Sequence, residues 1–180
     1  MIESNFSAYS VKASAILDEL KACGITHVVT VPDYVQLSVH RFLEQGYLPE
    51  VSVVPCSTED EAIVIAAGLY IGGKVPVVII QNQGLYACVN NLRGMGLDSN
   101  VPIFMMIGQF GREFSNLGKD TRDSSRRVVR ILEPLLDMLE VPYLCLEGPE
   151  DIGNIQKAFE ISRKHQSPAA LLIGAHTAWD

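Results

Sequence analysis

The sequence predicts an α/β fold: a doubly wound parallel sheet of six strands with helices on both faces. Six short apolar runs alternate along the chain with longer segments in which apolar residues recur at helical spacing. One of these runs, Val75–Ile80, is apolar without interruption, which is typical of a strand buried on both faces of a parallel sheet. Alternation of this kind builds a parallel sheet through helical crossovers.

Each element follows from its local pattern. The predicted strands are His27–Val31, Val51–Val54, Val75–Ile80, Ile103–Ile107, Tyr143–Leu146 and Ala169–Ile173. The predicted helices are 11–23, which Gly24 ends, Tyr34–Gln45, Glu59–Gly72, Leu85–Met95, Ser125–Leu139 and Asp151–Lys164. Pro134 should kink or restart the fifth helix, because proline cannot donate the helical hydrogen bond. The glycine-rich stretch Gly108–Asp120 is expected to be a loop.

The length of 180 residues predicts one domain covering residues 1–180. The chain is 48% hydrophobic, which excludes a disordered protein. Its net charge of −7, with no basic block, argues against nucleic acid or a membrane surface as a partner. No apolar run approaches the ~20 residues that span a bilayer. Met1–Ser10 lack the basic and apolar regions of a secretion signal.

The four cysteines, Cys23, Cys56, Cys88 and Cys145, fit no zinc or redox spacing. We interpret them as reduced, mostly buried thiols of a cytoplasmic protein. The sequence also lacks a GxSxG elbow, an HExxH motif, a GxGxxG turn and a P-loop, and we expect no metal ligands in this chain.

Ligands of open α/β sheets bind outside the carboxyl ends of the strands, so the residues that follow each strand are the first candidates. Most of these segments are polar or rich in glycine, and they should converge along one edge of the sheet. They are Pro32-Asp33-Tyr34, Cys56-Ser57-Thr58-Glu59, Gln81-Asn82-Gln83-Gly84, Gly108-Gln109-Phe110-Gly111-Arg112 and Gly174-Ala175-His176.

Two of these segments allow both a structural and a chemical interpretation. Thr58 and Glu61 fit a capping box. Glu59 either favours the positive end of the helix dipole or places a carboxyl at the mouth of the sheet for proton transfer. The turn Gln81–Gly84 either caps a helix or lines a ligand.

The other candidates are weaker. His27, His40 and His165 are expected to be structural or solvated, and His176 is a candidate only because it follows the last strand. A basic cluster lies downstream of Arg112 in this acidic chain. It either forms a solvated face paired with Asp120 and Asp123 or clamps an anionic substrate. Its members are Lys119, Arg122, Arg126, Arg127 and Arg130.

Two motifs together resemble thiamine-diphosphate enzymes. Glu59 precedes Gly68 by nine positions, and Gly73-Lys74 closes the helix, as in the glutamate helix of that family. The run Ile80–Leu85 followed by Asn90 is similar to the family's turn after a buried strand, and Val31-Pro32-Asp33 to its first strand exit. Within the family, the likeness extends to sulfopyruvate decarboxylase (its α subunit) and to the N-terminal half of phosphonopyruvate decarboxylase. It covers nearly the whole chain.

The resemblance implies a pyrimidine-binding domain and a role for each matched position. Glu59 would hydrogen-bond N1′ of the aminopyrimidine and favour the tautomer whose 4′ nitrogen removes the C2 proton of the thiazolium. Such a carboxyl should be poorly solvated, so that its proton affinity rises. Asp33 would handle protons near the substrate carboxylate. Residues Gln81, Asn82, Gln83, Gly84 and Leu85 would bind the pyrimidine, and Asn82 would also touch the substrate.

The family also holds diphosphate and Mg²⁺ through a Gly-Asp-Gly motif, which this sequence lacks. The resemblance therefore implies a second, β subunit that carries the domain binding diphosphate and Mg²⁺, in a hetero-oligomer with the cofactor between the two chains. This sequence departs from the family pattern at two places. Tyr86 stands where the family turn often has a second glycine, and no histidine follows Lys119-Asp120 where close relatives carry one.

The leading hypothesis is a subunit of a thiamine-diphosphate-dependent decarboxylase that converts a 2-oxo acid to an aldehyde and CO2. Arg112, Lys119 and Arg122 suggest that the substrate carries an anionic tail, as in sulfopyruvate or phosphonopyruvate. The alternatives are a carboligase similar to acetolactate synthase, which uses the same cofactor, and a non-catalytic module that has kept the fold.

Overall fold

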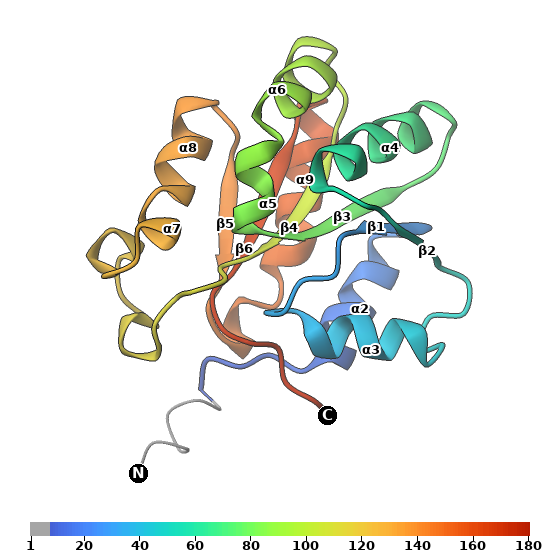
Figure 1. The fold of residues 1–180 in the computed structure, drawn as a ribbon. Coiled ribbons are helices and arrows are strands. Elements are labelled where there is room, and N and C mark those ends of the chain that lie inside the picture. Colours follow the sequence, from blue (N-terminus) through green and yellow to red (C-terminus); the bar gives the residue numbers. More distant parts are fainter. Residues whose placement is uncertain (1–7) are drawn as a thin grey trace.

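The computed structural model describes residues 8–180 (Figure 1). All but three residues of the segment Met1–Ser10, in which no secretion signal is expected, therefore lie outside the described part. Within it the chain forms one parallel six-stranded sheet in the order β2-β1-β3-β4-β6-β5. The strands are β1 (His27–Thr30), β2 (Ser52–Pro55), β3 (Pro76–Gln81), β4 (Phe104–Gly108), β5 (Tyr143–Leu146) and β6 (Ala169–Ile173). Each lies within one residue of its predicted position, so the α/β sheet prediction is confirmed.

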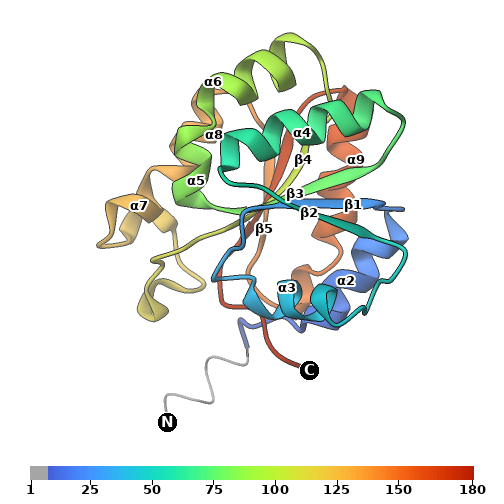
Figure 2. The same ribbon diagram turned by 45° about the vertical axis from the view of Figure 1, so that its right-hand side comes forward.

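Helices cover both faces of the sheet (Figure 2). The helices are α2 (Ala13–Ala22), α3 (Leu37–Glu44), α4 (Glu59–Ile71), α5 (Asn82–Ala87), α6 (Val89–Asn91), α7 (Arg127–Arg130), α8 (Leu132–Met138) and α9 (Asn154–His165). A π-helical segment, Leu92–Asp98, continues α6. Short 3-10 turns occupy Phe114–Asn116, Thr121–Asp123 and Pro149–Asp151.

The two faces have separate apolar cores, as a doubly wound sheet requires. On one face, α2, α3 and α9 pack against side chains that include Val28, Ile79 and Phe104. On the other, α4, α5, the π-helical segment and α8 pack against a second set that includes Val78 and Ile80. Strands β3, β4 and β6 are buried along almost their whole length.

Two of the predicted helices are interrupted, and α3 and α9 begin three residues later than predicted. The helix expected at Leu85–Met95 begins three residues earlier, at Asn82, and breaks at Cys88 before it passes into the π-helical segment. Gly94 and Gly96 weaken the regular helix there, and Gly96 lets Pro168 approach so closely that a Cβ would lie 2.4 Å from its Cγ. The helix expected at Ser125–Leu139 ends at Arg130 and restarts at Leu132. This break confirms the prediction for Pro134, because proline cannot donate to the Arg130 carbonyl.

The strand order fixes where a ligand can enter. The chain runs from β1 outward to the edge strand β2 and then returns to β3 on the other side of β1. A crevice opens at such a reversal, at the carboxyl ends of the strands. The exits of β1, β2 and β3 therefore lie around one crevice, and the exits of β4, β5 and β6 continue the same edge.

Two further findings concern the described residues as a whole. Between residues 8 and 180 no helix has both the length and the apolar character needed to cross a bilayer. All four cysteines are free thiols. Cys88 is buried and the other three are half-buried, so they are less buried than expected.

Candidate functional site

Glu59 and Gly84 meet at this edge of the sheet, although they follow different strands. Glu59 is the first residue of α4 and is half-buried, and Gly84 is buried in α5. A Cβ placed on Gly84 would lie 2.2 Å from the carboxyl carbon of Glu59. Only glycine leaves room for the Glu59 side chain in this position. The two motifs that carried the family resemblance therefore form one contact.

The capping box predicted at the start of α4 is only half present. The Thr58 side chain makes no cap hydrogen bond. In a capping box Glu61 would accept the N–H of Thr58. Here its Oε2 accepts the N–H of Ser57, one residue earlier, at 2.8 Å. Thr58 bonds the neighbouring Asp60 carboxylate and thereby lowers the pKa of that group. Glu61 thus has a structural role, which leaves Glu59 as the carboxylate that faces Gly84.

Asn82 anchors the turn Gln81–Leu85 from within. Its side chain is fully buried, and Nδ2 donates to the carbonyls of Phe110 at 3.1 Å and Val128 at 3.2 Å. Its Oδ1 accepts the Gln83 N–H at 2.9 Å. The amide therefore ties α5 to the β4 exit and to α7. Leu85 is buried in the core. Gln81 is half-buried and Gln83 is exposed, so these two side chains are the ones that the turn offers to a ligand.

Asp33 is buried at the exit of β1. Its Oδ1 accepts the Val35 N–H at 2.9 Å, and its Oδ2 accepts from Gln36 Nε2 at 2.8 Å. The carboxylate lies so close to Gly108 that a Cβ there would be 1.9 Å from Oδ2. Burial raises the pKa of Asp33 to about 6, although the bonds from Gln36 and Val35 act in the opposite direction. This carboxyl can therefore hold or release a proton near neutral pH.

Two residues beside Asp33 fix its surroundings. His40 is buried, which lowers its pKa to about 4, so the ring is neutral. Its Nε2 accepts the Asp33 N–H at 3.1 Å, which places the ring proton on Nδ1. Gln36 is also buried, and its Oε1 has no partner within the described chain. If its amide turned over, a protonated Asp33 could donate to this oxygen.

The glycine-rich loop expected at Gly108–Asp120 contains a buried arginine. The Arg112 side chain is 2% exposed, and Nη1 donates both to Glu147, at the β5 exit, and to Gln109 Oε1, the latter at 2.7 Å. Nε donates to Asn116 Oδ1, and Nη2 donates to the carbonyls of Asn116 and Lys119. All five guanidinium donors are thus used inside the protein. Arg112 joins the loop to β5, and it has no donor left for a substrate.

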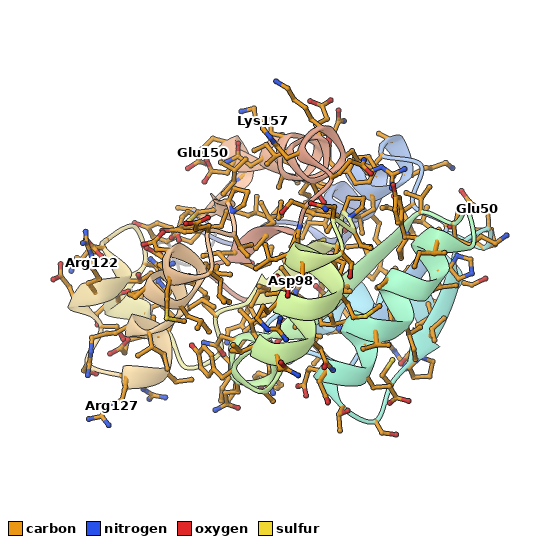
Figure 3. All side chains as sticks on the ribbon, turned by 90° about the horizontal axis from the view of Figure 1, so that it is seen from above. Glu50, Asp98, Arg122, Arg127, Glu150 and Lys157 are labelled. Atoms are coloured by element: carbon orange, nitrogen blue, oxygen red, sulfur yellow. The ribbon has the colours of Figure 1, made fainter. Side chains whose placement is uncertain are left out.

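The other two predicted substrate-binding cations behave differently from each other. Arg122 is paired with Asp120 at 2.6 Å, and its side chain is 73% exposed. It points outward, as does Arg127 (Figure 3). The pairing holds the pKa of Asp120 at about 2. Arg122 therefore belongs to a solvated surface and is paired with Asp120, which is one of the two alternatives predicted for the basic cluster. Lys119 is exposed and lines an open cavity of about 380 Å³ together with Arg122 and Thr121.

We refer below to Asp33, Glu59 and Gly84 as the carboxylate edge and to residues 112–130 as the arginine segment. Sequence reasoning predicted site roles for all three residues of the carboxylate edge. It did not single out Gln36, Gln109 or Glu147. Gln109 was visible as part of a strand exit, but nothing in the sequence indicated that it meets Arg112.

A comparison with protein families now decides the relationship. Residues 12–125 match the model of the thiamine pyrophosphate enzyme N-terminal TPP-binding domain. The chain belongs to the thiamine pyrophosphate enzyme family. The matched segment includes the whole carboxylate edge and the β4 exit. Thiamine pyrophosphate is another name for thiamine diphosphate. The resemblance to thiamine-diphosphate enzymes that the sequence indicated is therefore confirmed.

Individual relatives are distant but match along nearly the full length. The chain is 26% identical over 162 residues to the sulfopyruvate decarboxylase subunit alpha of Methanococcus maripaludis, covering 89% of this chain and 90% of that one. The same subunit of Methanocaldococcus jannaschii is also 26% identical, with 89% and 92% covered. Phosphonopyruvate decarboxylase of Streptomyces viridochromogenes is 25% identical over 84% of this chain, but the match spans only 36% of that enzyme.

The departure from the family turn at Tyr86 has a structural explanation. Its phenol donates to the Val128 carbonyl at 2.5 Å, and burial raises its pKa to about 12. Val128 also accepts from Asn82. Tyr86 therefore adds a second bond between α5 and α7 in this member of the thiamine pyrophosphate enzymes.

The residues present fit the pyrimidine end of thiamine diphosphate. The half-buried carboxylate of Glu59 stands beside a glycine that a side chain would block, and Gln83 is exposed next to it. Within residues 8–180 no group of three or more His, Cys, Asp or Glu side chains is arranged to hold a metal ion.

Proposed function

We propose that this chain is the pyrimidine-binding subunit of a thiamine-diphosphate-dependent decarboxylase that acts on a 2-oxo acid. The observation that carries the proposal is the contact between Glu59 and Gly84. It supports the proposal because a carboxylate beside this glycine would suit a hydrogen bond to the family's aminopyrimidine. When bound, the thiazolium ring of the cofactor accepts the electron pair released as a 2-oxo acid loses CO2.

Glu59 supplies the proton relay in this proposal. Its carboxyl would share a proton with N1′ of the aminopyrimidine, with which it would make a hydrogen bond. Gly84 leaves room for the Glu59 carboxyl, and Gln81 and Gln83 would contact the ring edge. Leu85 supports the turn from the core, and Asn82 holds it in place through Phe110 and Val128. In this arrangement Asn82 acts on the substrate through the position of the β4 exit.

In this proposal Asp33 is a second group that donates and accepts a proton. With a pKa of about 6, it is partly protonated near neutral pH. It would give a proton to the substrate-derived carbon after CO2 has left and would take one back from water. This role suits a carboxyl whose ionised form is disfavoured by burial.

A second subunit completes the proposed enzyme. It would carry the domain that binds diphosphate and Mg²⁺, so that the cofactor lies between the two chains of a hetero-oligomer. Support comes from relatives that are named alpha subunits, and from the absence of a Gly-Asp-Gly sequence in this chain.

The substrate proposal is a 2-oxo acid with an anionic tail. The names of the relatives support it, since sulfopyruvate and phosphonopyruvate both carry such a tail. Within this chain Lys119 is the better candidate to meet the tail, because Arg112 is fully engaged and Arg122 is paired with Asp120.

The experiment that tests the proposal is native mass spectrometry of the protein purified gently from its source, followed by product analysis. We expect a complex that contains a second chain, thiamine diphosphate and Mg²⁺, and that releases a free aldehyde and CO2. A new carbon–carbon bond in the product would indicate the carboligase instead. A homo-oligomer that stays empty when cofactor and Mg²⁺ are added would contradict the proposal.

A further inference from the structure

Helix α4 and the segment 82–98, which contains α5, α6 and the π-helical segment, lie side by side on one face of the sheet (Figure 1). Glu59 is the first residue of α4, and Gly84 lies in α5. The position of the Glu59 carboxyl therefore depends on how these two parts are aligned. Most of the contact between them is apolar and involves Ala62, Ala66, Leu85 and Leu92. Apolar contacts are not directional, so they leave the alignment of the two parts loosely defined.

A single polar contact joins the two parts. Asn91, the last residue of α6, is half-buried, and its Nδ2 donates to the Asp60 carbonyl at 3.2 Å. Because a carbonyl can only accept, this contact also determines which end of the amide faces α4. Among the hydrogen bonds between residues 8 and 180, it is the only one that connects α4 with the segment 82–98. Hydrogen bonds are directional, so this one can fix the alignment.

The acceptor of this bond lies in the first turn of α4, next to Glu59. A carbonyl has two lone pairs, so the Asp60 carbonyl can accept from Asn91 in addition to its helical bond. The Asp60 carboxylate bonds Thr58 instead. Asn91 thus holds the backbone of the turn from which the Glu59 side chain extends, rather than the carboxyl itself.

Asn91 is also connected to Gly84 through Cys88. The Cys88 thiol donates to the Gly84 carbonyl at 3.1 Å, and the Cys88 carbonyl accepts the Leu92 N–H at 2.8 Å. These bonds join α5 to α6 across the break at Cys88. Helix α4 therefore meets one bonded unit at two points, which are the Glu59–Gly84 contact and the Asn91–Asp60 bond.

The contact between Glu59 and Gly84 tolerates little displacement. A Cβ on Gly84 would lie 2.2 Å from three atoms of the Glu59 side chain, so the carboxyl passes close to the α5 backbone. A small shift of α4 along α5 would change the place of the carboxyl. Misplacing a reacting group by about 1 Å can lower a rate about 10²-fold.

We propose that Asn91 is a positioning residue for Glu59. Its hydrogen bond to the Asp60 carbonyl fixes α4 in the alignment that brings the Glu59 carboxyl to the pyrimidine end of thiamine diphosphate. This inference rests on the proposed function, because it takes the cofactor as the partner of Glu59. Asn91 acts through the backbone of α4 and does not itself bind the cofactor.

The test compares Asn91→Leu with Asn154→Leu in the enzyme assembled with its second subunit. Leucine keeps a branched side chain of similar size but has no donor. The control loses a bond of the same kind on the opposite face of the sheet, where Asn154 Nδ2 donates to the Cys145 carbonyl at 2.9 Å. We expect Asn91→Leu to lower the affinity for thiamine diphosphate, measured by calorimetry, about tenfold and to lower kcat at least about tenfold. Asn154→Leu should change neither quantity.

Asn91→Ala removes the same donor without adding apolar bulk, and alanine suits a helix. We expect it to give the same result as Asn91→Leu. Urea unfolding shows that each variant is folded. Native affinity and native kcat in either folded Asn91 variant would overturn the inference.

A double-mutant cycle with Glu59→Ala distinguishes positioning from a general structural role. Without the Glu59 carboxyl, Asn91 has nothing to position. We therefore expect Asn91→Leu to leave the affinity of the Glu59→Ala enzyme for thiamine diphosphate unchanged. An equal loss of affinity in the native and Glu59→Ala backgrounds would overturn the inference.

The same titrations separate this inference from the proposed function. If the native assembled enzyme does not bind thiamine diphosphate, the proposed function fails and the inference fails with it. If the native enzyme binds the cofactor and the Asn91 variants bind it equally well, only the inference fails.

Discussion

The carboxylate edge and the arginine segment lie at the same end of the sheet, yet their charged groups are used in opposite ways. At the carboxylate edge, Glu59 faces a glycine, and Asp33 accepts two bonds while burial disfavours its charge. In the arginine segment, Arg112 makes five hydrogen bonds to protein groups and is paired with Glu147. The number of bonds already made within the chain therefore distinguishes groups that are free to react from groups that hold the structure. Charge alone does not make this distinction.

The sharpest test of the carboxylate edge is Glu59→Gln. The amide keeps the size of the side chain but cannot share a proton with the aminopyrimidine. We expect CO2 release by the assembled enzyme to fall by about 10²–10⁴-fold, which is the range for a lost proton-transfer group. Folding and assembly should be unchanged.

The matched control is Glu61→Gln, two residues along the same helix. Its amide oxygen can still accept the Ser57 N–H, so we expect nearly native turnover. Equal rates for the two variants would refute the proton-relay role of Glu59.

In the arginine segment, the corresponding test is Arg112→Ala, measured as the free energy of unfolding in urea. This change leaves the Glu147 carboxylate without its arginine partner. It also removes the hydrogen bonds through which Arg112 joins the glycine-rich loop to the end of β5. We expect a loss of about 3–5 kcal/mol, which is typical when one member of a buried ion pair is removed.

Arg122→Ala is the control, because it removes an exposed arginine of the same segment. We expect no measurable loss of stability, since its bond to Asp120 is solvated. A small effect of Arg112→Ala on stability with a large effect on KM would return Arg112 to the substrate-binding role.

Asp33 gives a pH-dependent test. Its pKa is raised from 3.8 to about 6 in the folded chain, so folding favours its protonated form. Its stabilising contribution is present below about pH 4 and is lost as the pH rises through about 6. Between these two pH ranges, the contribution of Asp33 to the free energy of unfolding changes by about 3 kcal/mol at most.

Asp33→Asn removes this titration. Relative to the native chain, we expect the variant to be more stable above pH 6 and to lack the decline between pH 4 and 6. Gln36 Oε1, which has no partner in the described chain, can accept from the new amide. Urea unfolding at several pH values measures the effect, and parallel pH profiles for the two proteins would contradict it.

The smallest expected effect belongs to Gly84→Ala. Alanine favours the helix, but its Cβ would displace the Glu59 carboxyl. We expect the affinity for thiamine diphosphate, titrated calorimetrically with the assembled enzyme, to fall about tenfold. Gly94→Ala is the control, because a Cβ there meets nothing within 4 Å. A Gly84→Ala variant with native affinity would show that the contact does not position Glu59.

The sheet was predictable because its signals are local. Apolar runs such as Val75–Ile80 and breaks such as Gly24 act over a few residues. The helix after β3 was less predictable, since its π-helical continuation packs at Gly96 against Pro168, which lies far away in the sequence. A similar limit applied at the edge of the sheet. Glu59 and Asp33 could be predicted as site residues from the strand exits and the family resemblance. The ion pair of Arg112 could not, because its partner Glu147 lies 35 residues away and only the fold brings the two together.

The position of β6 also bears on how the chain is made. In the described sheet, β5 pairs with β6 alone, and β6 is inserted between β5 and β4. During synthesis, β1 to β4 can pair in turn as they leave the ribosome. Strand β5 emerges before its neighbour exists and must wait for residues 169–173. The Arg112–Glu147 pair, which depends on this part of the sheet, therefore forms late, after the Glu59–Gly84 contact can already be in place.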